Sequence, residues 1–526
     1  MKDFPWLSVL IALPLVGAVL VSALPRARET LVKQAALAVS VVVAIATLVM
    51  ASQFDPDGAR FQYDEKYWWI KQFGVHWALG VDGVALVLIV LSVILVPLVM
   101  LASWSEDDRS GGVDVPAKRS VKTYFALLLT LEAAMIGVFA ATDVFLFYVF
   151  FEAMLIPVYF IIGYFGGPQR SYAAVKFLLY SLLGGMIMLV AVIWLYPLSN
   201  KAVSDGGVGH GTFLFSELTK MDVDPTTAKW LFLGFFVAFA IKAPMVPVHT
   251  WLPDAAQQSP PGALVLIVGV LDKVGTYGML RFCLELFPGA SKWATPVVLG
   301  FAVLSIIYGA VLAIGQVDLK RLIAYTSVSH FGFIVLGIFA MTSQGQSGAA
   351  LYMVNHGFST GALFLVVGFM IVRRRSARIG DYGGVQKAAP VLAGTFLVAG
   401  LSGLSLPGLA PFASEFLVLT GTFTRYRVPA VIATAGVVLA AIYILWMYQR
   451  TMGGPKAEAV EGMRDLSARE KWAVAPILAI IVALGFFPQP VLNVINPSVK
   501  QTLVRVDERD PAPKITGNVA ENGARP

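Results

Sequence analysis

Six ionisable residues stand isolated within long apolar runs of the sequence: Glu152, Lys242, Lys273, His330, His356 and Glu415. A charged side chain at the middle of a bilayer costs roughly 3 kcal/mol on insertion scales, so each such residue marks a functional site by default. Carboxylates, amines and imidazoles are also the groups that take up and release protons, and imidazole does so near neutral pH. The pattern therefore predicts a proton path inside a membrane protein.

The composition excludes several classes of protein. Of the 526 residues, 57% are hydrophobic and 13% are charged, whereas an average soluble domain has about 25% charged residues. The one cysteine, Cys283, cannot by itself provide a disulfide, an iron–sulfur cluster or a structural zinc site. The basic residues behind the net charge of +7 lie in short segments between apolar runs, which argues against nucleic-acid binding. We expect no metal and no cofactor on this chain.

Apolar runs long enough to cross a bilayer recur along the chain. A crossing helix needs about 20 mostly apolar residues. The sequence predicts about fourteen such helices, at 6–24, 31–51, 84–104, 121–141, 143–166, 176–198, 229–250, 262–287, 294–316, 321–341, 347–372, 391–422, 428–450 and 472–490. We therefore predict an all-α integral membrane protein, formed by residues 1–526 as a single polytopic domain.

The distribution of basic residues between the loops predicts the orientation. If the N-terminus lies outside, the inner loops hold about twice as many lysines and arginines as the outer segments, and basic residues favour the cytoplasmic side. We expect a multi-pass protein of a bacterial plasma membrane, with both termini on the non-cytoplasmic side. The polar segment 497–526 predicts a mobile or partner-bound tail.

Prolines accompany two of the isolated residues. Pro244 and Pro247 follow Lys242, and two further prolines precede Glu415. A proline within a helix removes a backbone N–H donor and breaks the helix. Unpaired backbone at membrane depth is tolerated only where protein or water reaches it, and broken helices form ion sites in transporters. We predict that the seventh and twelfth helices are broken beside these residues.

The surroundings of Lys273 provide a second pattern. Tyr277 lies one helical turn after Lys273 and on the same face, so an internal water chain could use both groups. The adjacent Asp272 points about 100° away around the helix, which separates it from Lys273. Tyr277 is therefore a secondary candidate for the path.

Four more ionisable residues need an interpretation. Glu132 falls near the middle of its apolar run, and His249 follows the first proline-broken segment, so both are secondary candidates. Arg281 and Glu285 are four residues apart near the end of the eighth run, and this spacing predicts an interfacial ion pair.

The isolated residues repeat along the chain. Glu152 precedes Lys242 by about the same interval as His330 precedes Glu415, in each case from the second helix of a five-helix block to its fourth, broken helix. The blocks are 121–287 and 294–450, preceded by residues 1–120 with three helices and followed by the last helix at 472–490. Because five is odd, the second block inserts upside down relative to the first, as in many secondary transporters.

The stretch from Ile241 to Pro260 resembles the antiporter-like subunits of respiratory complex I, relatives of the Mrp-type cation/proton antiporters. The resemblance covers nearly the whole chain. It implies that a glutamate on helix five pairs with a lysine on broken helix seven, that a lysine on helix eight links the two halves, and that a titratable residue on broken helix twelve closes the path. The matching residues are Glu152, Lys242, Lys273 and Glu415, with His330 and His356 resembling the central relay histidines.

The residue on helix twelve separates types within this family. The other two complex I types and the Mrp subunits generally carry lysine there, so Glu415 makes the chain similar to the NuoM type, the chain-4 subunit of mitochondria. The resemblance implies a non-redox subunit of a proton-translocating NADH:quinone oxidoreductase. The NADH, flavin, iron–sulfur clusters and quinone would belong to other subunits, and the partners would be the lipid bilayer and membrane-arm subunits that include two further antiporter-like ones.

Three other functions remain open at this point. A Mrp-type sodium/proton antiporter subunit has the same fold, and Glu415 in place of lysine argues against it. Membrane-bound hydrogenase complexes use related subunits. A haem-binding quinol oxidoreductase would use His330 and His356 as its one possible pair of axial ligands.

Overall fold

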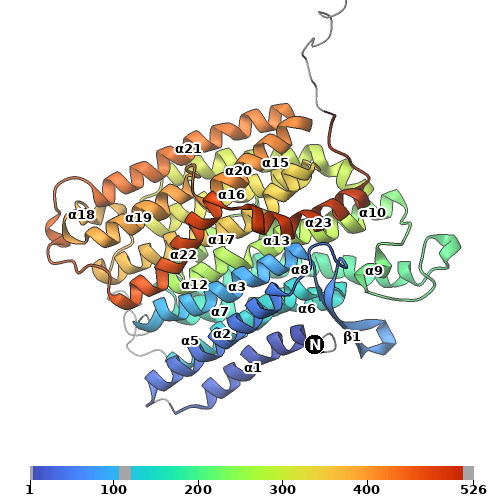
Figure 1. Cartoon of the computed structure of the whole chain (residues 1–526), viewed down its shortest axis with the longest axis horizontal. Coiled ribbons are helices and arrows are strands. Elements are labelled where there is room, and N and C mark those ends of the chain that lie inside the picture. Colours follow the sequence, from blue (N-terminus) through green and yellow to red (C-terminus); the bar gives the residue numbers. More distant parts are fainter. Residues whose placement is uncertain (1–3, 26, 106–119, 513–526) are drawn as a thin grey trace, which may run out of the picture.

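The computed structural model describes residues 4–25, 27–105 and 120–512 of the chain. Long helices lie side by side along the longest axis of the molecule (Figure 1). In these described ranges, 11 helices are long and apolar enough to cross a membrane, or up to 12 if the bent pair α22 and α23 forms one span. The protein is a mostly helical integral membrane protein, and the helix bounds follow the predicted apolar runs closely.

The helices fall into continuous and interrupted groups. The continuous ones are α1 (Trp6–Ala23), α2 (Glu29–Ser52), α3 (Gly83–Ala102), α5 (Val121–Ala140), α8 (Arg170–Ser199), α15 (Pro288–Ile314), α16 (Leu319–Phe339), α17 (Ser343–Arg374) and α21 (Arg427–Met452). The interrupted ones are α6 (Val144–Ala153) with α7 (Leu155–Phe165), α10 (Pro225–Lys242) with α11 (Trp251–Gln258), α19 (Pro390–Gly403) with α20 (Ala410–Arg425), and α22 (Ala468–Phe486) with α23 (Gln489–Val506).

One further span contains two π-helical turns. It consists of α12 (Pro261–Leu266), η4 (Ile267–Leu271), α13 (Lys273–Gly278), η5 (Met279–Cys283) and α14 (Leu284–Leu286). The short helices α9 (Phe215–Leu218) and α18 (Val385–Ala388) lie in loops. Wider π-helical turns shift the side chains that follow relative to an α-helix and are frequent at functional sites.

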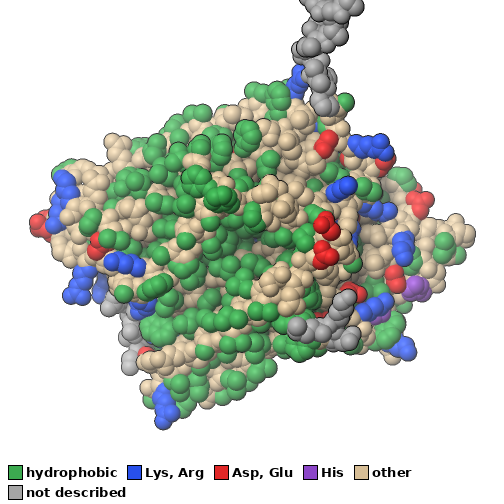
Figure 2. All heavy atoms as spheres, viewed as in Figure 1, with side chains coloured by type: hydrophobic (Ala, Val, Ile, Leu, Met, Phe, Trp, Pro, Cys, Tyr) green, Lys and Arg blue, Asp and Glu red, His purple; other side chains and the backbone are tan. Residues whose placement is uncertain are grey.

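The spans differ in how much of their surface is buried. The most apolar window is 100% buried in the span from Pro261 to Leu286 and 94% buried in α16 and in α17, but only 28% buried in α2 and 33% in α21. A helix that is apolar on all sides must lie inside a bundle or face lipid. Figure 2 shows hydrophobic side chains over the middle of the visible face and most charged ones toward its two ends. The central spans are thus shielded from lipid by the outer ones.

The all-α fold includes one β-hairpin, at residues 62–81, that the sequence did not predict. β1 (Gln62–Ile70) and β2 (Val75–Val81) form an antiparallel hairpin in which Tyr67 pairs with Trp77 and Trp68 with His76. Aromatic residues favour strands, and paired strands satisfy the backbone of a long loop.

Both ends of the described chain lie at the hairpin end of the molecule. At the start of α1, the backbone N–H of Leu7 donates to Glu65 on β1 at 2.8 Å. Near the end of α23, the Thr502 hydroxyl donates to Glu285 at 2.8 Å. Glu285 in turn forms an ion pair of 2.5 Å with Arg60, just before the hairpin. The chain therefore crosses the molecule an even number of times.

The ion pair predicted between Arg281 and Glu285 does not form. Arg281 instead pairs with Asp82 at 2.5 Å, and Glu285 pairs with Arg60. Arg281 lies in the π-helical turn η5, where residues four apart no longer stack as they do in an α-helix. Both side chains are buried, so the pairs tie the end of this span to α3 and to the hairpin segment.

The polar segment from residue 497 onward differs from the prediction up to Val506. It continues α23, with Ile495, Val499, Leu503 and Val506 buried along one face. The Ser498 hydroxyl accepts a hydrogen bond of 3.0 Å from the backbone of Gly83 at the start of α3. Residues spaced by three and four give the helix one apolar stripe despite its polar composition. The part of the predicted tail from residue 513 lies outside the described residues.

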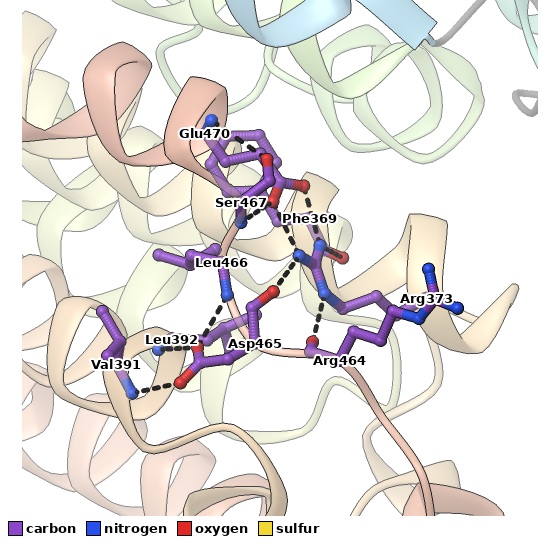
Figure 3. Close-up of polar contacts among 9 residues, drawn as sticks. All are labelled: Phe369, Arg373, Val391, Leu392, Arg464, Asp465, Leu466, Ser467 and Glu470. Atoms are coloured by element: carbon purple, nitrogen blue, oxygen red, sulfur yellow. Dashed lines mark hydrogen bonds and ion pairs between the residues drawn. The ribbon is translucent and has the colours of Figure 1, made fainter.

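A cluster of polar contacts joins α17, α19 and α22 (Figure 3), at the end of the molecule that lies opposite β1 in Figure 1. Arg373 on α17 forms a two-pronged contact with Glu470 on α22, at 2.8 and 2.7 Å, and also donates to the carbonyl of Asp465 at 2.9 Å. The Asp465 carboxylate accepts from the N–H groups of Val391 and Leu392 at 2.9 and 2.8 Å. It therefore caps α19 from another segment.

Substitution of Asp465 by alanine should weaken this end of the bundle. Partial burial opposes ionisation of Asp465, but hydrogen bonds from backbone N–H groups outweigh it and lower the pKa of its carboxyl. Loss of a helix cap costs about 1 kcal/mol, so we expect Asp465→Ala to reduce the free energy of unfolding by about that amount.

The loss of stability caused by Asp465→Ala should become smaller as the pH falls. A lowered pKa in the folded state stabilises the fold above the ordinary pKa of aspartate, and this contribution is lost as pH falls through the lowered pKa. Thermal unfolding of the purified protein, followed by tryptophan fluorescence, should show the wild type and Asp465→Ala converging in acid. Asp222→Ala at an exposed loop position is the control, and an equal loss in both variants would contradict the capping role.

Candidate functional site

The first broken span ends at Lys242. α10 stops there and the chain becomes helical again at Trp251. The carbonyl of Ile241, which has no helical partner, accepts the indole N–H of Trp251 at 2.9 Å. The backbone N–H of Val246 donates to the hydroxyl of Ser305 on α15 at 3.0 Å. Side chains thus satisfy backbone groups at the break, so the break is a built feature of the span.

Lys242 itself lacks a close anionic partner. It is completely buried, and among the described residues its ammonium nitrogen has no hydrogen-bond partner. The nitrogen lies 5.1 Å from the ring centroid of Phe151 and 5.6 Å from that of Phe177. Aromatic faces stabilise a cation at such distances. Of the two carboxylates that attract this lysine through space, Glu152 on α6 has the larger effect.

Glu152 lies at an interruption that the sequence did not predict. α6 ends one residue later, at Ala153, and α7 begins at Leu155. Pro157 removes the N–H that would pair with the Ala153 carbonyl, which accounts for the interruption. Glu152 is half-buried, and its Oε1 packs so closely on Gly185 of α8 that a Cβ added there would collide with it. The glycine therefore makes room for the carboxylate.

Lys273 and His356 are in direct contact. Both are buried, and the Lys273 ammonium lies 2.7 Å from Nδ1 of His356 on α17 and donates to the carbonyl of Val268 at 2.5 Å. The other ring nitrogen of His356 lies 3.1 Å from the hydroxyl of Thr360. Because an ammonium can only donate, Nδ1 of His356 accepts from it, and the proton of the neutral ring is on Nε2.

His330, Tyr352 and Glu415 form a continuous hydrogen-bonded series. His330 Nδ1 lies 2.6 Å from the hydroxyl of Tyr352, which donates to Glu415 Oε2 at 2.7 Å. A hydroxyl has one proton, so while Tyr352 donates to Glu415 the proton on His330 must be on Nδ1. The rings of His330 and His356 are 5.3 Å apart between centroids. The two hydrogen-bonded groups are therefore adjacent, with no direct hydrogen bond between the histidine rings.

The second broken span positions Glu415. α19 ends at Gly403 and α20 begins at Ala410. Ser405, between them, has a φ of +59°, which is unfavourable for a residue other than glycine, and its hydroxyl donates to Glu415 Oε2 at 2.6 Å. Asn355 on α17 donates to the carbonyl of Ala410 at 2.7 Å. The break thus brings a hydroxyl to the carboxylate, and strain of this kind is common where a site needs it.

The secondary candidates lie apart from these groups. The Tyr277 hydroxyl donates to the Phe139 carbonyl at 3.0 Å and accepts from Arg281 at 3.3 Å, so it makes no hydrogen bond to Lys273. Glu132 is completely buried and accepts from Ser40 on α2 at 2.9 Å. His249 is buried with its ring centroid 5.5 Å from that of Tyr308.

Two members of the hydrogen-bonded series were missed from the sequence. Tyr352 lies four residues before His356 on α17, and this helical spacing could have indicated it. Ser405 carries no comparable signal, since its contact with Glu415 depends on the path of the chain through the break.

Comparison with known proteins gives full-length matches. The sequence model of a family described as NADH:quinone oxidoreductase/Mrp antiporter, TM matches residues 141–442. The chain is 50% identical to NADH-quinone oxidoreductase subunit M of Mycobacterium tuberculosis, over 100% of this chain and 98% of that protein. It is 39% identical to subunit M of Rhodobacter capsulatus, over 94% of this chain and 95% of that one.

Solved structures agree in fold. A chain of respiratory complex I from Thermus thermophilus superposes with a TM-score of 0.84 at 30% identity, covering 95% of this chain and 99% of that one. A chain of the Mrp complex from a Dietzia species superposes with a TM-score of 0.81 at 20% identity, covering 95% and 98%. With its broken spans and its series of buried ionisable residues, the chain belongs to the NADH:quinone oxidoreductase/Mrp antiporter family of membrane proteins.

Proposed function

We propose that the chain is a proton-translocating membrane subunit of an NADH:quinone oxidoreductase, and that protons pass through its buried ionisable residues. The observation that carries the proposal is the series from Lys273 through His356 and His330 to Tyr352 and Glu415, in the interior of the bundle. Full-length similarity to subunit M proteins supports the assignment. Groups that each gain or lose a proton, placed in succession through a bilayer, form a relay.

The relay begins with an electrostatic switch at Lys242. Attraction by a carboxylate favours the charged form of a buried lysine, and removal of that carboxylate favours release of the proton. Glu152 is suited to this role because it lies at an interrupted helix and interacts with Lys242 without a direct contact. A small movement of α6 would therefore change the attraction. Released protons move toward Lys273 and from there to His356.

The exit half of the relay uses hydrogen bonds that are already formed. A proton arriving at His330 Nε2 allows Nδ1 to release its proton to Tyr352, and Tyr352 to pass its own to Glu415. The step from His356 to His330 needs water or a ring rotation, because these rings are adjacent but not hydrogen-bonded.

The broken pairs α10–α11 and α19–α20 extend the count of spans. Each of these two pairs counts as one crossing, in addition to the up to 12 spans formed by the other helices, so we infer fourteen crossings. An even number agrees with the two ends of the described chain, which lie at the same end of the molecule. The two blocks of five, from α5 to α14 and from α15 to α21, then form inverted repeats. Loops rich in arginine at the end opposite the hairpin favour both termini on the non-cytoplasmic side of a bacterial plasma membrane.

The redox chemistry belongs to other subunits in this proposal. NADH, flavin, iron–sulfur clusters and quinone would be bound outside this chain, which would act as a non-redox subunit beside other membrane-arm subunits, two of them antiporter-like. Similarity to a Mrp complex chain at 20% identity concerns the fold alone. A carboxylate at Glu415, held by two hydroxyl donors, favours the redox-driven function over the ion-exchange one.

Removal of either end of the relay should stop proton translocation. In the complex assembled in vesicles, Lys242→Ala and Glu415→Gln should each reduce NADH-driven proton uptake by about a hundredfold or more, the lower end of the range for loss of a positioned proton-transfer group. The measurement is quenching of a pH-sensitive dye. Lys220→Ala, at an exposed position outside the bundle, is the matched control and should pump normally. Normal pumping by both relay variants would overturn the proposal.

Removal of one hydroxyl should interrupt the exit half. Tyr352→Phe keeps the ring that packs against His330 but removes the bridge to Glu415. We expect proton uptake to fall on the order of a hundredfold, while the assembled complex retains NADH oxidation by an artificial acceptor that bypasses the membrane arm. Tyr443→Phe tests whether any buried tyrosine has this effect, since among the described residues its hydroxyl has no hydrogen-bond partner. Equal losses in both variants would contradict a specific role for Tyr352.

A further inference from the structure

Asp272 is a buried carboxylate that the relay described above does not use. It is completely buried, and neither of its oxygens has a hydrogen-bond partner among the described residues. A buried ionised carboxylate without partners is costly, and a carboxylate with a purely structural role is normally satisfied by N–H or O–H donors. Asp82 and Asp465 in this protein show that pattern, each capping a helix. Asp272 caps nothing.

The π-helical turn before Asp272 sets its position. The backbone N–H of Asp272 donates to the carbonyl of Ile267, five residues earlier, at 3.1 Å. This turn, η4, changes the direction of Asp272 relative to the residues that precede the turn. The same turn supplies the Val268 carbonyl that accepts from Lys273. One local distortion thus organises both ionisable residues.

The electrostatic surroundings of Asp272 are two lysines. Its charged partners are Lys273, next to it on the same span, and Lys242 at the break of α10. Lys242 is in turn influenced by two carboxylates, Glu152 and Asp272. The segment α13 packs directly against α10. Asp272 therefore interacts both with the lysine that receives protons first and with the lysine that passes them to His356.

We propose that Asp272 carries the proton between Lys242 and Lys273. This inference rests on the proposed function and adds a specific residue to it. In the first step the Lys242 ammonium gives a proton to the Asp272 carboxylate, which leaves a neutral amine and a carboxylic acid. In the second step the acid gives the proton to the neutral Lys273 amine, which restores the carboxylate and forms an ammonium. Each transfer runs through intervening water, and only N–H and O–H bonds form and break.

The role requires that Asp272 changes its protonation state during turnover. Infrared difference spectra of the assembled complex, recorded between the oxidised and NADH-reduced states, should contain a C=O stretching band of a buried carboxylic acid. The band should be absent in Asp272→Asn and shifted in Asp272→Glu. A residue that serves only as a fixed negative charge would give no such band. If the wild-type spectrum contains no carboxylic acid band that Asp272→Asn removes, the proposal is overturned.

Proton pumping supplies the second readout. Asp272→Asn, which keeps the size of the side chain, should lower NADH-driven proton uptake about a hundredfold or more, and Asp272→Glu should restore most of it. Lys242→Ala in the same vesicles separates two failures. If Lys242→Ala abolishes pumping and Asp272→Asn does not, Asp272 is not a carrier although the proposed function stands. If both variants pump normally, the proposed function itself fails.

Discussion

The structure depends on the cost of placing charge and unpaired backbone inside a bilayer. Every ionisable residue proposed for the path lies at a place where that cost is compensated. Lys242 is surrounded by aromatic faces at a broken helix, and Lys273 donates to a carbonyl in a π-helical turn. Glu415 accepts from two hydroxyl groups. The compensation is incomplete at Glu152, Lys242 and Asp272, where polar atoms stay without partners among the described residues. Incomplete compensation keeps a group able to change its charge.

The arrangement of spans follows from the same constraint. The helices that carry Lys273, His330 and His356 are almost entirely buried, and more lipid-exposed helices surround them. Water-excluding surroundings strengthen the electrostatic interactions among the buried groups. Ion pairs such as that between Arg281 and Asp82 hold the ends of the central spans without entering the path. Ion pairs thus anchor the ends of the bundle, whereas the titratable groups of the path lie at its centre.

Much of this could be predicted from the sequence because prolines and isolated charges are local signals. Pro244 and Pro247 indicated the break at Lys242, and the apolar runs indicated the spans. The contacts that complete the site could not be predicted, because they join segments far apart in the chain. Ser405 reaches Glu415 only through an unusual backbone conformation. Asp272 was left out of the path, because its interaction with Lys242 joins two spans that are far apart in the chain.

The central claim is that the buried groups form one continuous path for protons. The most direct measurement is a high-resolution cryo-electron microscopy structure of the assembled complex in lipid, with its internal water resolved. A continuous path requires ordered water between Lys242 and Asp272 and between the rings of His356 and His330, in at least one redox state. A dry, apolar gap at either position in every redox state would contradict it.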